Sequence, residues 1–296
     1  MNNKKQIICS VLLVFFILIA FFHTSHQTGL AEKKAYIVEE DIIYGKVDGV
    51  ELKLNLARPA KGRRQLPALV FIFGGGWAQG SRIQYSSQIR QAAERGYVAV
   101  TVDYRLTNVR ENGKVKYTFP AQIHDVKCAV RWLRANAKRY KIDPNRIGAV
   151  GWSSGGHLAL MLGLTDPSNG LEGECGDLQH SSSVQAVVSL AAPIEMRTPG
   201  EIRFYSVPLL GGTPEEVPEL YTMASPLTYV GNDDSSFLII HGDNDSSVPF
   251  NNAELLNAKM NEMGTVHTFI IKKGSGHFIP VDNDVWDFFD EHLKGN

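Results

Sequence analysis

The stretch Gly151-Trp152-Ser153-Ser154-Gly155 decides how the rest of this chain is interpreted. It follows an apolar run at residues 147–150 and leads into a helical pattern from Gly156 onward. A G-x-S-x-G sequence between a strand and a helix is typical of a sharp turn that exposes a nucleophilic serine. Glycine is favoured at its two ends because a Cβ there would crowd the turn. The stretch therefore predicts Ser153 as a nucleophile; the alternative is a Gly/Ser loop that merely precedes a helix.

Strand and helix patterns alternate along the rest of the chain. We expect strands at 42–47, 50–57, 67–73, 97–102, 147–150, 184–190, 237–240 and 266–271, and helices at 82–95, 120–140, 156–162, 251–263 and 281–293. Asp48-Gly49 joins the first two strands and is a strong hairpin signal. Such alternation predicts an α/β domain, an eight-stranded, mostly parallel sheet with helices on both faces. Ser153 then follows the fifth strand, as in the α/β-hydrolase fold.

Three successive glycines, Gly74 to Gly76, come directly after the third strand and precede Trp77. Backbone N–H groups of such a loop could hold a developing oxyanion, each donor contributing about 3–4 kcal/mol to the transition state. We expect the donors around Gly75, Gly76 and Trp77, together with the N–H of Ser154. A flexible loop or a phosphate cradle are the alternatives, although the Lys-Ser/Thr pair of a P-loop is missing.

The ends of the seventh and eighth strands supply a candidate acid and a candidate base. His277 lies in the loop Gly274-Ser275-Gly276-His277, where it could reach across the sheet edge. The other histidines lie in the N-terminal segment, on helices, in a polar loop (His180), at the start of the acid loop (His241), within a strand or at the chain end, and fit this role less well. Asp243 and Asp245 both follow the seventh strand, and position alone does not choose between them as the partner of the histidine.

Composition and length limit the possible functions. The chain has 296 residues, of which 44% are hydrophobic, and a formal net charge of -1. This length can build one large α/β domain, which we place at 41–296. The nearly balanced charge argues against a nucleic acid partner.

The N-terminal segment is typical of an export signal. Lys4 and Lys5 precede an apolar stretch at 7–22 that is relieved only by Ser10. We expect a signal peptide at 1–31, cleaved after Ala31, then a linker at 32–40. An uncleaved membrane anchor is the alternative, and it is the only case in which we expect a membrane partner.

Cys128 and Cys175 are the cysteines outside this segment. An oxidising compartment would permit a disulfide between them. We nevertheless expect two separate thiols, because Cys128 falls on the apolar face of a helix and can be a small buried residue.

A set of further motifs carries a resemblance to a known family. They are Phe73-Gly-Gly-Gly-Trp77, Asp103-Tyr-Arg-Leu106, Ile142-Asp-Pro-Asn-Arg-Ile147, Gly151-Trp-Ser-Ser-Gly-Gly-His157, Ser225-Pro-Leu-Thr228, His241-Gly-Asp-Asn-Asp245 with Val248-Pro249, and Gly276-His277. Over about 41–292 the chain resembles the esterase/lipase-like α/β hydrolases related to bacterial feruloyl and acetyl-xylan esterases, and more distantly the hormone-sensitive-lipase group. The resemblance implies that Asp245 is the acid. Members of this group usually have a histidine before the glycines, where this chain has Phe73. This difference affects the geometry of the loop and not the chemistry, because the oxyanion donors are backbone groups.

The resemblance implies a serine carboxylesterase that acts through an acyl-enzyme and needs neither metal nor organic cofactor, and the N-terminal segment implies that it is exported. We expect short-chain acyl, feruloyl or acetyl esters, including small-molecule or carbohydrate esters. A modest insert at about 192–224 forms a small cap, in which Phe204 and Tyr205 would bind substrate with Trp77 or, alternatively, only pack the insert. An amidase or peptidase of the same fold, or a non-catalytic binding module, are the alternative functions.

Overall fold

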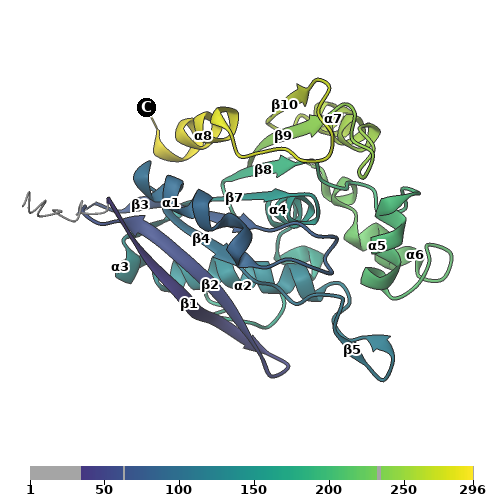
Figure 1. Cartoon of the computed structure of the whole chain (residues 1–296), viewed down its shortest axis with the longest axis horizontal. Helices are drawn as coiled ribbons and strands as arrows, with labels where there is room; N and C mark the ends of the chain where they lie inside the picture. The colour runs from purple at the N-terminus through teal and green to yellow at the C-terminus, as the bar shows by residue number, and fades with distance from the viewer. Residues whose placement is uncertain (1–34, 63, 232–234, 296) are drawn as a thin grey trace, which may run out of the picture. The chain divides into compact units, whose positions relative to one another are not determined.

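An eight-stranded sheet forms the centre of the structure, with its strands in the order β1-β2-β4-β3-β7-β8-β9-β10 (Figure 1). The structure is a computed structural model that describes residues 35–62, 64–231 and 235–295. The expected signal or anchor at 1–31 and the first part of the expected linker lie outside these residues. Among the described residues, no helix has both the length and the apolar character needed to cross a membrane.

Only β2 runs against the other strands of this sheet, because it pairs antiparallel with both β1 and β4 and the remaining pairs are parallel. The expected mostly parallel α/β-hydrolase sheet is thus confirmed. The strands are β1 (Tyr36–Val47), β2 (Val50–Pro59), β3 (Leu66–Ile72), β4 (Val98–Val102), β7 (Ile142–Trp152), β8 (Ala186–Leu190), β9 (Ser236–Gly242) and β10 (His267–Lys272). A separate small hairpin pairs β5 (Arg110–Glu111) with β6 (Lys114–Val115).

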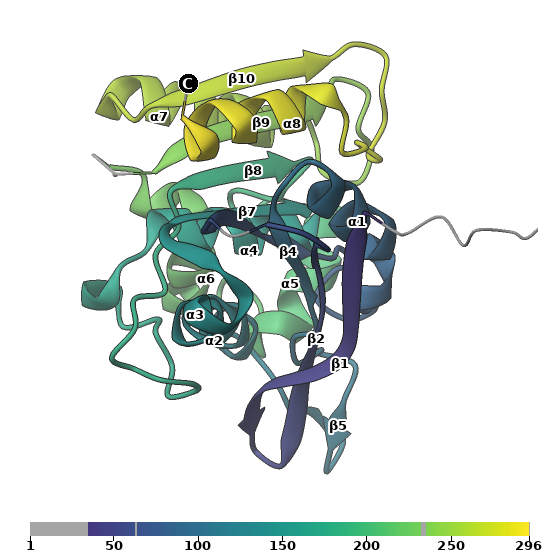
Figure 2. The same ribbon diagram turned by 90° about the vertical axis from the view of Figure 1, so that its left-hand side faces the viewer.

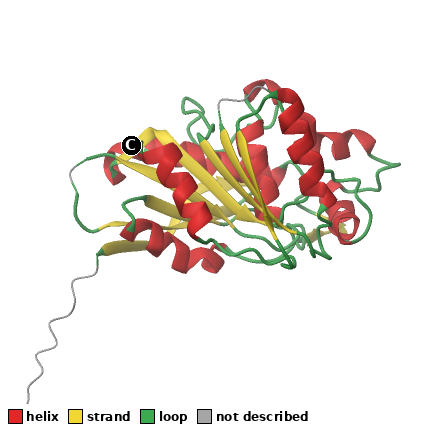
Figure 3. Cartoon of the chain, turned by 90° about the horizontal axis from the view of Figure 1, so that it is seen from above, coloured by secondary structure: helices red, strands yellow, loops and turns green. Residues whose placement is uncertain are grey.

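Helices cover both faces of the sheet (Figure 3). They are α1 (Ser86–Glu94), α2 (Ala121–Ala135), α3 (Ala137–Tyr140), α4 (Ser154–Leu164), α5 (Glu201–Leu210), α6 (Pro218–Ala224), α7 (Asn251–Met263) and α8 (Asn283–Phe289). The space beside Gly148 of β7 is filled by Phe289 of α8, whereas Gly163 of α4 lies against Val187 of β8. Val187 pairs with Ala149, the neighbour of Gly148, so α8 and α4 lie on opposite faces.

The first strand begins earlier than the sequence indicates. β1 starts at Tyr36, so 36–40 belong to the sheet and not to a linker. A register shift between Glu39 and Ile42 interrupts the alternation of its side chains, and Asp41 has a φ of 57°. Such a bulge hides a strand from a search for alternating residues. Tyr36 pairs with Pro59 at the end of β2, and the two strands lie side by side (Figure 2). Because β2 is antiparallel to β4, the start of β1 lies at the amino-terminal edge of the parallel strands.

The helix expected over 120–140 is divided in two. α2 ends at Ala135, and α3 begins at Ala137. The side-chain Nδ2 of Asn136 donates a hydrogen bond to the carbonyl of Trp132 at 2.9 Å. An asparagine that bonds to the backbone in this way competes with regular helix formation.

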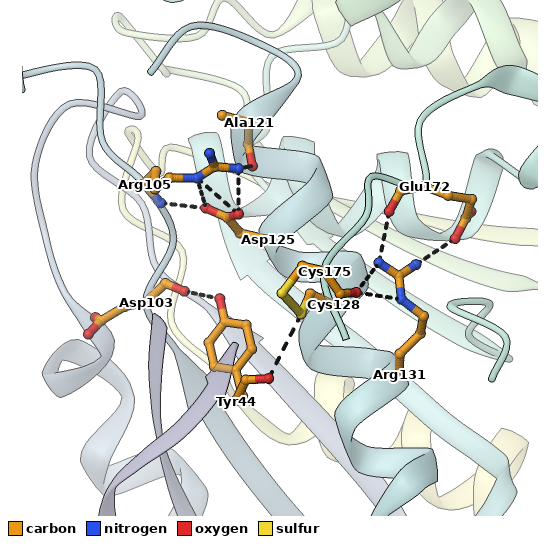
Figure 4. The surroundings of a disulfide bond; sticks show 9 residues. All are labelled: Tyr44, Asp103, Arg105, Ala121, Asp125, Cys128, Arg131, Glu172 and Cys175. Atoms are coloured by element: carbon orange, nitrogen blue, oxygen red, sulfur yellow. Dashed lines mark hydrogen bonds and ion pairs between the residues drawn. A yellow bond between two sulfur atoms is a disulfide. The ribbon is translucent and has the colours of Figure 1, made fainter. Parts of the chain in front are cut away.

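A disulfide joins Cys128 of α2 to Cys175, so the prediction of two separate thiols is wrong (Figure 4). The loop that carries Cys175 folds back over α2, where Arg131 donates to the Cys175 carbonyl at 2.8 and 3.0 Å and to a Glu172 carboxylate oxygen at 2.8 Å. These contacts bring the two cysteine Cα atoms to 5.3 Å, which is within the range that a disulfide spans.

Candidate active site

Ser153 lies in the sharp turn between β7 and α4 at the carboxyl edge of the sheet. Its φ of 56° and ψ of -125° are sparsely populated for a residue with a side chain. A Cβ on Gly151 would come within 2.2 Å of the Gly155 backbone, and one on Gly155 within 2.1 Å of the Ile72 carbonyl oxygen. Both glycines are therefore required for the turn to close against β3.

Ser153, His277 and Asp245 come together at this edge, although each follows a different strand. The Nε2 of His277 lies 3.0 Å from the Ser153 Oγ, and its Nδ1 lies 2.8 Å from the Asp245 Oδ2. Both contacts are within hydrogen-bond distance. When a carboxylate, an imidazole and a serine hydroxyl are hydrogen-bonded in this order, the imidazole can activate the hydroxyl as a nucleophile.

The carboxylate of Asp245 is buried and accepts hydrogen bonds from several directions. Its Oδ1 accepts the backbone N–H groups of Ser247 and Val248, each at 2.9 Å. The Nε2 of His241 lies 3.1 Å from its Oδ2 and 2.9 Å from the Val248 carbonyl. Burial acts to raise the pKa of Asp245, but hydrogen bonds from His241, His277 and the Val248 N–H outweigh it and hold the pKa well below its usual range. Asp245 therefore stays ionised.

His241 is a residue of the site that sequence reasoning missed. It is 1% exposed at the end of β9 and contacts the same Asp245 oxygen as His277 does. The only hint in the sequence is its place four residues before Asp245, because both flank one tight loop.

The other candidate acid, Asp243, has a different place. Its Oδ1 accepts the backbone N–H of Gly274 at 2.6 Å. It thereby ties the loop after β9 to the loop that carries His277. No hydrogen bond of the described residues joins Asp243 to His277.

The glycine loop after β3 lies beside Ser153. Gly75, Gly76 and Trp77 all have positive φ values, of 133°, 59° and 55°. The Gly75 carbonyl accepts the N–H groups of Ala78 and Gln79, both at 3.1 Å, which closes the loop as a tight turn. Successive backbone N–H groups in such a turn can form an anion-binding concavity.

Phe73 braces this loop through packing. Its ring stacks on that of Tyr104 with centroids 4.3 Å apart and an interplanar angle of 11°. Its carbonyl accepts a hydrogen bond from the Tyr104 hydroxyl at 3.0 Å. A Cβ on Gly80 would come within 2.6 Å of the same phenyl ring. Phe73 thus holds both ends of the loop without a polar side chain.

A cavity of about 540 Å³ opens above Ser153. Among the residues expected at the site, its lining includes Gly75, Gly76, Trp77, Ser153, Ser154, Tyr205 and His277. It also includes residues that sequence reasoning did not single out, namely Gln79, Trp152, Pro193, Glu201, Ile202, Ser247 and Val248. These additional residues come from five separate segments that only the fold brings together.

The two aromatic residues expected in the cap differ in position. The Tyr205 ring packs onto Gly76, where an added Cβ would lie 2.4 Å from it. Phe204 does not line the cavity; it is 73% exposed and packs edge-on against Tyr205. Consecutive residues of a helix point about 100° apart, so only one of the two faces the cavity.

Trp152, the residue before Ser153 in the G-x-S-x-G stretch, forms a wall of the site. Its indole N–H donates to the His277 carbonyl at 2.7 Å, and its ring centroid lies 4.9 Å from that of His277. Trp152 thus helps to hold the histidine loop beside Ser153. Within the described ranges, no three His, Cys, Asp or Glu side chains gather as a metal site would require.

Comparisons with known proteins agree with this architecture. The sequence model of the BD-FAE family matches residues 54–260. Esterase LipC of Mycobacterium tuberculosis is 30% identical over 259 residues, which cover 84% of this chain and 62% of LipC. Esterase LipQ of the same organism is 30% identical, over 76% of this chain and 53% of LipQ. The chain thus spans about half to three fifths of the length of these curated relatives.

Solved structures are similar over nearly the whole described domain. A carbohydrate esterase from gut microbiota, in a truncated form, has a TM-score of 0.77 and 28% identity, covering 88% of this chain and 98% of that one. Thermogutta terrifontis esterase 2, phosphorylated by paraoxon, has a TM-score of 0.68 and 29% identity, covering 86% and 90%. The chain therefore belongs to the BD-FAE family, among the esterase/lipase-like α/β hydrolases.

Proposed function

We propose that the protein is a serine carboxylesterase in which Ser153, His277 and Asp245 form the catalytic triad. The observation that carries this proposal is the His277 imidazole, whose two nitrogens lie 3.0 Å from the Ser153 Oγ and 2.8 Å from the Asp245 Oδ2. The names of the similar proteins, Esterase LipC and a carbohydrate esterase, support ester hydrolysis as the reaction.

In the proposed mechanism, the Nε2 of His277 takes the proton of the Ser153 hydroxyl as its Oγ attacks the ester carbonyl carbon. Asp245 stays ionised, fixes the tautomer of His277 through Nδ1 and stabilises the imidazolium. The negative charge on the carbonyl oxygen is held by N–H groups around Gly75, Gly76 or Trp77 and by that of Ser154.

The tetrahedral intermediate collapses as the bond to the alcohol oxygen breaks, and the imidazolium gives its proton to that oxygen. This leaves the acyl group on Ser153. A water molecule then gives a proton to His277 and attacks the acyl carbon. The bond between this carbon and the Ser153 Oγ breaks, and His277 returns the proton to Oγ, which releases the acid and restores the serine.

The proposed substrates are short-chain acyl, acetyl or feruloyl esters, including esters on carbohydrates. The cap is small, because it consists of α5, α6 and their connections, and Tyr205 and Ile202 cover only part of the cavity. An open cavity lets a bulky alcohol part of the ester extend beyond it. Export through the segment at 1–31 would give the enzyme access to extracellular polymers.

The test is labelling with a fluorophosphonate probe, combined with kinetics on the full chain. Wild-type protein should be labelled, and Ser153→Ala should lose both the label and about 10⁴-fold or more of kcat. Ser168→Ala changes an exposed serine in the short turn after α4 that does not line the cavity, and this variant should behave as the wild type. Absence of labelling in folded protein would contradict the proposal in favour of a binding module, and faster turnover of aminoacyl amides than of acetate esters would favour an amidase.

A further inference from the structure

A second cleft lies on the other side of Trp152 from the proposed catalytic cavity. It has a volume of about 790 Å³ and is lined by Gln84, Tyr85, Gln88, Trp152 and residues 278–281. Trp152 lines both cavities, with its ring 4.9 Å from the His277 ring and 5.9 Å from the Phe278 ring. A molecule in the second cleft therefore lies directly beside the reacting groups.

The cleft combines exposed aromatic surface with amide groups. Phe278 is 71% exposed, which is unusual for a large apolar side chain next to a candidate base. The half-buried Trp152 extends this aromatic surface, whereas Tyr85 lines the cleft but is only 8% exposed. Gln84 and Gln88 add amides that can both donate and accept hydrogen bonds. Among the described residues that line the cleft, none carries a charged side chain.

One polar atom of the cleft lacks a partner. The Oε1 of Gln88 is buried and accepts no hydrogen bond from any described residue. Burying an acceptor without a partner costs about 1–3 kcal/mol, so a native protein normally has a reason to keep one. The Gln88 side chain lines the cleft, so a rotamer that turned its Oε1 toward a hydroxyl donor on a bound molecule would remove this cost.

We propose that this second cleft is a subsite for a neutral sugar unit in the alcohol part of the ester. A sugar ring presents C–H groups on its face, which suit Phe278 and Trp152, and hydroxyls on its edge, which suit the two amides. A lining without cations does not favour an anionic ligand. This inference rests on the proposed esterase function.

The position of the cleft assigns it to the alcohol part and not to the acyl part. The leaving oxygen must come within reach of the His277 Nε2, which gives it a proton. Phe278 and Ile279 directly follow His277 in the chain, so the cleft borders the histidine side of the site. The acyl group is left with the cavity formed by Gly76, Ile202 and Tyr205.

The test compares two esters of the same acid on the full chain: ethyl acetate and a monoacetylated xylotriose, each followed by acid release in a pH-stat. Wild-type protein should have a higher kcat/KM for the xylotriose ester. Phe278→Ala should lower that value about tenfold, because it removes an apolar contact of the sugar face. Gln88→Leu should lower it about fivefold, because one hydrogen bond is lost. Both variants should keep kcat/KM for ethyl acetate within about twofold.

Two controls separate binding from folding. Gln88→Leu removes the buried unpartnered oxygen, so its Tm should equal or exceed that of the wild type even though turnover of the sugar ester falls. Leu178→Ala changes an apolar side chain that is 60% exposed and lies outside the cleft, and it should affect neither ester.

The proposal is overturned if both esters lose activity equally, if neither variant affects the xylotriose ester, or if the wild type does not prefer that ester. Failure of the wild type to hydrolyse ethyl acetate is a separate outcome, because it contradicts the proposed esterase function itself.

Discussion

The disulfide between Cys128 and Cys175 gives a prediction about stability whose size can be worked out. The two cysteines are 47 residues apart, so the closed loop contains β7, Ser153 and α4. In the chain-entropy treatment, a cross-link that closes a loop of this length removes about 4 kcal/mol of conformational freedom from the unfolded state. We therefore expect Cys175→Ala to lower the free energy of unfolding by about 4 kcal/mol.

The measurement is urea unfolding followed by tryptophan fluorescence, with and without a reductant. A loss of this size should move the midpoint of the wild type by roughly 1.3–2 M urea on reduction, given an m-value of about 2–3 kcal/mol/M. The Cys175→Ala variant is the control, since reductant should not move its midpoint further. The hydrolysis rate of a small ester at 25 °C should stay unchanged, because neither cysteine lines the catalytic cavity.

Coinciding unfolding curves for oxidised and reduced wild-type protein would refute this reasoning. They would mean that contacts such as those of Arg131 and Lys127 with Glu172 persist in the unfolded chain and already keep the two cysteines near each other. The cross-link would then constrain an unfolded chain that is compact without it.

Two further predictions concern charged and titrating groups near the site. Asp245→Asn should lower kcat by about 10⁴-fold, because an amide cannot hold the required tautomer of the histidine. Asp243→Asn should leave kcat nearly unchanged, since the Oδ1 of the asparagine can still accept a hydrogen bond from the Gly274 N–H. The reverse ranking in steady-state kinetics would identify Asp243 as the acid. Burial lowers the pKa of His157 from 6.5 to about 4. Between these pH values the unfolded chain binds a proton at His157 and the folded chain does not. The free energy of unfolding should therefore fall by up to about 3 kcal/mol as the pH drops from 6.5 to 4. Urea midpoints measured across this range should depend less on pH in His157→Gln, and an equal dependence in both proteins would contradict that origin.

The strand-end residues of the site could be predicted because parallel strands bring their carboxyl ends to one edge. This rule places Ser153, the glycine loop and His277 together from the sequence alone. It could not separate Asp243 from Asp245, because both follow β9 and differ only in how the loop turns.

Other features depend on packing that has no periodic signal. His241 contacts Asp245 only because the loop after β9 folds back on the strand end. Cys175 lies in an irregular segment whose position over α2 is set by Arg131 and Glu172. The orientation of α5, and not its sequence, decides that Tyr205 faces the cavity while Phe204 faces solvent.

The start of β1 at the amino-terminal edge of the parallel strands has a practical consequence. Ser153 and its partners occupy the opposite edge, so anything joined ahead of residue 35 is attached at the far end of the domain. A solid support, a fluorescent fusion partner or a targeting domain placed there would leave the cavity open. Immobilisation through the N-terminus should therefore preserve access even for insoluble polymers.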